Sequence, residues 1–180
     1  MGGDWEDVDL SVLQRRAELL AHPRASGDAV AETAALLEFT LMDGRYAVPL
    51  DAVEAVLRIG QIVGIPLTPK HLAGVIRRRG RTIALVSLRH FFHPEHEGVV
   101  DADFAVIVVA EGKRFALQVE EIEGVVHVPK PELVAAPDNF DKAQAPYVVA
   151  VTTAGLAVLD LDRLVRTNGF GMDSAYAGGR

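Results

Sequence analysis

Short apolar runs arranged in pairs dominate the chain from residue 36 onward. The two runs of each pair are separated by a short turn that contains glycine, which is the pattern of two strands joined in a hairpin. The pairs are 36–42 with 45–50, 73–79 with 81–88, 104–110 with 113–119, and 147–153 with 156–161. Many short strands at this spacing predict an all-β protein, either a barrel or a sandwich.

The pattern before residue 34 has a helical period instead. Apolar residues recur there at three- and four-residue spacing, as on one face of a helix: Leu10, Leu13, Ala17 and Leu20. Pro23 ends this helix, and residues 23–33 have the composition of a linker. We therefore expect an N-terminal helix and linker over residues 1–33, a β domain over 34–168 and a flexible tail over 169–180.

The β domain contains an internal repeat at an offset of 69 residues. When residues 45–59 are set against 114–128, four of the 15 positions are identical. These are Arg45/Arg114, Ala47/Ala116, Glu54/Glu123 and Val56/Val125. Farther along, LVSLRHFF (85–92) is similar to VLDLDRLV (158–165). The repeat predicts two related β modules, at 34–92 and 103–168, with a groove between them as a natural docking site.

Composition and charge exclude several classes of function. The formal net charge is −7, so nucleic-acid binding, which needs clustered basic residues, is not expected. The chain has no cysteine, which excludes disulfides and thiolate chemistry. We expect a cytoplasmic protein, because no run is long and apolar enough to span a bilayer. No catalytic or cofactor-binding motif is present, so we expect no enzyme activity and no cofactor.

A histidine-rich segment offers a weak alternative to this non-enzymatic interpretation. His90, His93 and His96 are spaced at three residues, and imidazoles can bind zinc or nickel. Pro94 lies inside the run, however, so no regular helix can align the three rings. We therefore predict no metal site, and a metal-dependent enzyme remains the less favoured alternative.

Four blocks, in order, resemble the CheW family of chemotaxis adaptors. They are FTLMDGRYAVPLDAVEAVLR, TPKHLAGVIRRRGRTIALVSLRHFF, VIVVAEGKRFALQVEEIEGVV and YVVAVTTAGLAVLDLDRLV, which span residues 36–165 approximately. The resemblance implies two SH3-like five-stranded β-barrels that share a core. It also implies an adaptor that couples the cytoplasmic tips of methyl-accepting chemoreceptors to the regulatory domain of a CheA-type histidine kinase. Such a protein would lie at membrane receptor arrays through its partners and could also meet other CheW-like modules.

The same resemblance assigns candidate contact residues on two surfaces. On the receptor side they are Val53, Val56, Gly74, Arg79 and Gly80. On the kinase side they are Val134 and Phe140, in a proline-rich loop over 129–146. The residues themselves support Arg79 most, because glycine at a hairpin tip allows a tight turn that holds the neighbouring arginine outward. For the apolar candidates the alternative is core packing, and for Gly74 it is close backbone packing or a bulge.

The chain departs from the usual family pattern next to this hairpin. Arg77 and Arg78 stand where the family usually has Asn-Leu, and with Arg79 and Arg81 they make a basic cluster. A solvated hairpin and a surface for an acidic partner are both compatible with such a cluster. The departure leaves open a second function, that of a CheW-like scaffold or competitor in a signalling pathway other than chemotaxis.

Overall fold

The computed structural model describes residues 7–8, 32–95, 102–138 and 140–168. Its strands are β1 (Asp7–Val8), β2 (Thr33–Leu41), β3 (Gly44–Pro49), β4 (Val53–Arg58), β5 (Leu72–Arg78), β6 (Arg81–Ser87), β7 (Phe104–Ala110), β8 (Lys113–Val119), β9 (Glu121–Pro129), β10 (Val148–Val151) and β11 (Leu156–Leu159). Two α-helices, α2 (Leu88–Phe92) and α3 (Leu161–Asn168), and three 3-10 turns, η1 (Leu50–Ala52), η2 (Lys130–Glu132) and η3 (Ala145–Tyr147), complete the described elements.

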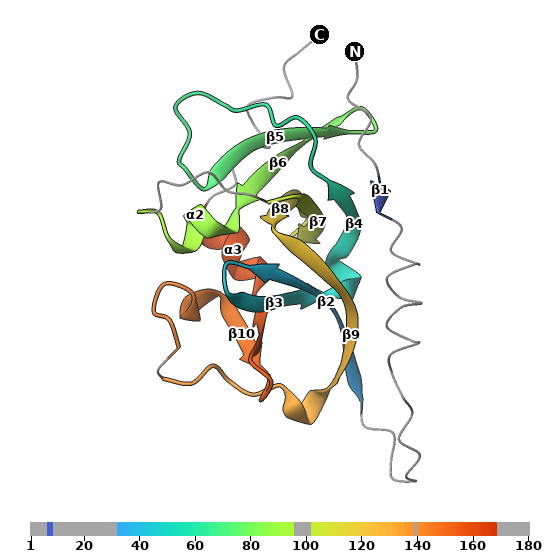
Figure 1. Ribbon diagram of the computed structural model, residues 1–180, viewed down its shortest axis with the longest axis vertical. Helices are drawn as coiled ribbons and strands as arrows, with labels where there is room; N and C mark the ends of the chain where they lie inside the picture. The colour runs from blue at the N-terminus through green and yellow to red at the C-terminus, as the bar shows by residue number, and fades with distance from the viewer. Residues whose placement is uncertain (1–6, 9–31, 96–101, 139, 169–180) are drawn as a thin grey trace.

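The strands form two sheets, which lie one above the other in Figure 1. Sheet A has the order β1-β4-β7-β8-β6-β5, in which the two-residue β1 is an addition to five longer strands. Sheet B has the order β10-β11-β3-β2-β9. Most neighbours are antiparallel, but β6 pairs with β8 and β3 pairs with β11 in parallel. The prediction of a mostly β protein with five-stranded units is therefore confirmed.

The two sheets have the same internal order, as the sequence repeat requires. Strands β4-β7-β8-β6-β5 of sheet A correspond one for one to β9-β2-β3-β11-β10 of sheet B. The similarity between residues 85–92 and 158–165 also has a structural counterpart, because β6 leads into α2 and β11 leads into α3. Neither helix was predicted from the sequence.

The halves of the chain do not fold as separate modules, which corrects the division into 34–92 and 103–168. Sheet A takes β7 and β8 from the second half, and sheet B takes β2 and β3 from the first half. Each half therefore contributes a strand pair to the other sheet. This exchange leaves both sheets dependent on the whole domain, because each is completed only by strands from the other half.

One hydrophobic core joins the two sheets, as predicted. It contains Phe39 and Val48 from sheet B together with Val86 and Leu117 from sheet A, and α2 and α3 pack into it. Smaller clusters lie within sheet A and within sheet B. Burial of each large apolar side chain contributes about 1.5–3 kcal/mol, so this shared core fixes the position of one sheet relative to the other.

The ends of the chain are described only in part. The helix expected over residues 10–20 and the tail over 169–180 lie outside the described residues. β2 begins at Thr33, one residue before the predicted domain boundary. Asp7 and Val8 pair with Leu57 and Val56 of β4, so the N-terminal extension contacts the domain at sheet A.

Candidate functional site

A tight hairpin between β5 and β6 carries the strongest candidate from the sequence. Arg79 has a φ of 46° and Gly80 a φ of 77°, and both residues are exposed. Two successive residues with positive φ form the turn type that matches the twist of paired strands. The predicted positive φ at Gly80 is confirmed, and this turn presents Arg79 at the surface.

The hairpin tip borders a hollow of about 340 Å³, here called the arginine hollow. Its lining residues come from β4, β5, β6, β8 and the turn, and they are Glu54, Arg78, Arg79, Arg81, Ile83 and Arg114. The Glu54 carboxylate accepts a hydrogen bond from Arg114 Nε at 2.5 Å, and its other oxygen lies 3.6 Å from Arg78 Nη1. One carboxylate thus orders two of the four guanidinium groups.

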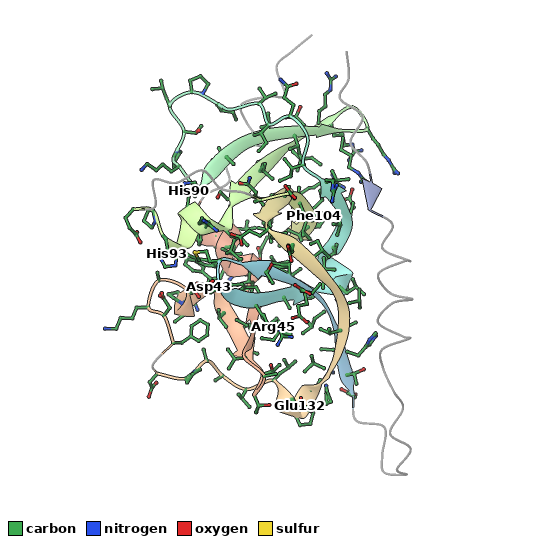
Figure 2. The ribbon with its side chains drawn as sticks, viewed as in Figure 1. Asp43, Arg45, His90, His93, Phe104 and Glu132 are labelled. Carbon is green, nitrogen blue, oxygen red and sulfur yellow. The ribbon has the colours of Figure 1, made fainter. Side chains whose placement is uncertain are left out.

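Sequence analysis did not place Glu54 and Arg114 in this site. A signal was nevertheless available, because both occupy identical positions of the internal repeat. The counterparts in sheet B are Glu123 and Arg45, of which Arg45 is labelled in Figure 2. Arg45 Nη2 lies 2.6 Å from the Oε1 of buried Glu38, and this hydrogen-bonded contact raises the pKa of Arg45. In sheet B the repeated arginine thus pairs with Glu38 of β2, which is not the repeat counterpart of Glu54.

The two valines proposed for the receptor surface differ in exposure. Val53 is half-buried beside η1 and remains a candidate contact. Val56 has no exposed surface and packs in the shared core, while its neighbours Ala55 and Leu57 pack in the cluster of sheet A. Since β4 is buried on both faces, Val56 cannot contact a partner, and we remove it from the candidate surface.

Gly74 is buried beneath the connector between β4 and β5. Its φ is +147°, and a Cβ there would lie 2.3 Å from the carbonyl oxygen of Val63. Val75 N donates to Val63 O at 3.0 Å, and Val63 N donates to Val75 O at 3.3 Å. These contacts correspond to close backbone packing, the alternative that the sequence left open for this glycine. Gly74 therefore positions the connector and presents no surface of its own.

The proposed kinase side lies on the edge of sheet B. Val134 exchanges two backbone hydrogen bonds with Val151 of β10, and its side chain is 50% exposed. Val149 of β10 is also exposed. Phe140 differs from both, because it is half-buried and packs against the shared core. Val134 thus remains a candidate contact, whereas Phe140 also holds the loop against the protein.

A buried hydrogen bond fixes the loop that carries Val134 and Phe140. The hydroxyl of Tyr46 donates to Gln144 Oε1 at 2.8 Å, and both side chains are buried. Burial raises the pKa of Tyr46 above its ordinary value. Because a buried hydroxyl is costly to leave unpaired, this bond anchors the loop to β3.

The described histidines do not converge on one point. Ser87 Oγ and His90 Nδ1 are 3.0 Å apart, whereas His93 faces Glu95 at 3.3 Å (Figure 2). In the part of the chain that the structure describes, no three His, Asp or Glu side chains are grouped to hold a metal ion. His96 lies outside that part. Within the same residues, no helix is long and apolar enough to cross a membrane.

Comparisons with known proteins agree with the resemblance seen in the sequence. The family model of the CheW-like domain matches residues 35–168. The chain belongs to the CheW-like domain family. One solved structure with the same fold is the scaffolding protein CheW from Thermoanaerobacter tengcongensis, with a TM-score of 0.66 and 22% sequence identity. The similarity covers 77% of this chain and 96% of that protein. No curated protein matches the chain.

The CheW-like match includes both candidate surfaces and leaves the N-terminal extension outside it. Val53 lies on β4 of sheet A, Arg79 lies in the turn between β5 and β6 of that sheet, and Val134 lies against the edge of sheet B. This CheW-like domain therefore presents two surfaces on two sheets that a common core holds together.

Proposed function

We propose that this protein is an adaptor that couples methyl-accepting chemoreceptors to a CheA-type histidine kinase. The CheW-like match over residues 35–168 supports this proposal, as does the fold shared with a protein described as a scaffold. In the proposal the protein acts at the cytoplasmic side of receptor arrays through its partners. No catalytic step is assigned to it.

The separation of the two candidate surfaces carries the proposal. The receptor would contact the exposed hairpin tip at Arg79 and Gly80, with Val53 as an apolar neighbour on sheet A. The kinase would contact the edge of sheet B near Val134. Since the candidate residues belong to different sheets, both partners can be held at the same time.

The mechanism that we propose is templating by a rigid body. The shared core fixes one sheet relative to the other, so a receptor on sheet A and a kinase on sheet B would keep a defined distance and orientation. A change at the receptor site would then alter the binding of the kinase through a coupling free energy between the two sites, typically about 1–3 kcal/mol.

The test is the formation of a ternary complex in solution. The protein is mixed with a soluble receptor signalling fragment and the regulatory domain of a kinase from the same genome, and size-exclusion chromatography follows the three chains. We expect a peak that contains all three proteins and is lost when this protein is omitted. Two mutually exclusive binary complexes would contradict the adaptor and would instead indicate a competitor.

A further inference from the structure

The two sheets hold the ends of their connectors in the same way. In sheet A, the residue before β5 is His71, whose carbonyl oxygen accepts a hydrogen bond from Ser87 N at 2.7 Å. In sheet B, the residue before β10 is Tyr147, whose carbonyl oxygen accepts one from Asp160 N at 2.8 Å. Ser87 and Asp160 directly precede α2 and α3. His71 and Tyr147 are therefore equivalent positions of the internal repeat.

Phe91 of α2 contacts both of these positions. The rings of His71 and Phe91 meet edge to face with their centroids 5.7 Å apart, and the rings of Phe91 and Tyr147 do so at 4.8 Å. This is a favoured geometry for aromatic pairs at about 4.5–7 Å. Burial lowers the pKa of His71 below its ordinary value, so the neutral ring makes this contact at pH 7. The three rings, here called the aromatic link, join the two connectors through α2, which lies between the β5–β6 hairpin and β10 in Figure 1.

The aromatic link lies between the two candidate surfaces. His71 is at the base of the β5–β6 hairpin, and the tip of that hairpin presents Arg79. Tyr147 is at the end of the connector between β9 and β10, and the same connector presents Val134. Phe91 thus contacts the base of the hairpin that carries one candidate residue and the end of the segment that carries the other.

The fold does not require an aromatic ring at the position of Phe91. Its counterpart in α3 is Leu164, which is enclosed in the shared core. Phe91 is half-buried and packs against that core without being enclosed by it, whereas Leu88 and Phe92 of α2 are fully buried there. Two other residues of α2 therefore fill the core, and the contacts of Phe91 with both connectors need another explanation.

We propose that Phe91 couples the two connectors, so that a displacement at the base of the β5–β6 hairpin changes the stability of the pairing between Val134 and Val151. Closely packed rings transmit such a displacement because they leave little free space between them. The coupling itself requires no partner. Its consequence rests on the proposed function, under which receptor binding at Arg79 alters kinase binding near Val134 through Phe91.

Hydrogen exchange of the free full-length protein tests the coupling. Val134 and Val151 each donate a backbone hydrogen bond to the other, and the exchange rates of both amides report the opening of this pairing. We expect Phe91→Leu to raise both rates about fivefold or more, and His71→Ala to do the same from the other sheet. The double variant should exchange no faster than Phe91→Leu, because the route from His71 is then already broken.

Two controls separate this coupling from a general loss of stability. His71→Phe keeps an aromatic ring and should exchange at the wild-type rate. Gly124→Ala lies in β9, at the opposite edge of sheet B from β10, and should not accelerate the Val134 and Val151 amides relative to the amide of Leu117 in the shared core.

Three results would overturn the coupling. The first is an unchanged exchange rate in Phe91→Leu. The second is a rise in that variant that the Leu117 amide shares equally. The third is an effect of His71→Ala that is the same with and without the Phe91 ring.

A second measurement tests the consequence for the adaptor. The affinity for the kinase regulatory domain is measured with and without saturating receptor fragment, for the wild type and for Phe91→Leu. We expect each partner alone to bind the variant within about twofold of the wild type, and the receptor-induced change in kinase affinity, about fivefold in the wild type, to be lost. An equal change in both proteins would overturn the consequence. If neither partner binds the wild type, the proposed function fails, whereas hydrogen exchange still decides the coupling.

Discussion

An Arg79→Glu variant is expected to lose receptor binding while it keeps its fold and its affinity for the kinase. Arg79 is exposed at the tip of a hairpin, where a substitution usually changes stability by about 0.5 kcal/mol or less. Reversal of its charge at a protein contact costs several kcal/mol, because like charges then face each other. Receptor and kinase binding are measured separately by calorimetry, together with a melting curve.

Lys70→Glu is the matched control for this variant. Lys70 is exposed like Arg79 but precedes β5, whereas Arg79 follows it. The control should bind both partners as the wild type does. Unchanged receptor affinity in folded Arg79→Glu would remove Arg79 from the contact surface. Equal loss of both affinities with a lower melting temperature would show that Arg79 is a structural residue.

A Gly74→Ala variant is expected to be strongly destabilised. Gly74 has a φ of +147°, and the new Cβ would lie 2.3 Å from the carbonyl oxygen of Val63, which belongs to the backbone and cannot rotate away. Backbone strain and steric overlap together cost about 2–5 kcal/mol. The free energy of unfolding from urea titration measures this loss.

Gly124→Ala separates strain from overlap. Gly124 has a similar φ of +135°, but nothing lies within 4 Å of a Cβ built there. The free energy of unfolding of this control should therefore fall only by the cost of backbone strain, about 1–3 kcal/mol. If Gly74→Ala lowers the free energy of unfolding by no more than Gly124→Ala does, the connector does not pack closely against β5. The packing role assigned to Gly74 would then be wrong.

Features encoded by a few adjacent residues could be predicted from the sequence. The hairpin turns at Gly80, Gly112 and Gly155 have positive φ, because the turn type alone demands it. The turn expected between the runs 36–42 and 45–50, at Asp43-Gly44, lies one residue earlier, at Met42-Asp43, and Gly44 begins β3. Gly44 serves another purpose, since a Cβ there would lie 2.7 Å from the Tyr46 ring. A glycine needed for packing was thus interpreted as a turn residue.

Features that depend on distant partners could not be predicted. Alternation of polar and apolar residues identifies strands but does not name their neighbours, so the exchange of strand pairs between the two halves was missed. The same limit explains why Val56 was wrongly proposed as a receptor contact. A strand that is buried on both faces has no polar side, so the spacing of its apolar residues cannot distinguish a contact residue from a core residue. Glu54 and Arg114 are 60 residues apart and meet only in the folded sheet.

The most direct test of the adaptor is calorimetric titration of this protein with the regulatory domain of each CheA-type kinase in its own genome. We predict saturable binding to at least one domain, with a dissociation constant below about 100 μM, which corresponds to about −5.5 kcal/mol. A Val134→Glu variant should weaken that binding, because it places a charge at the exposed edge of sheet B. No detectable heat with any of these domains, from protein that melts cooperatively, would contradict the account.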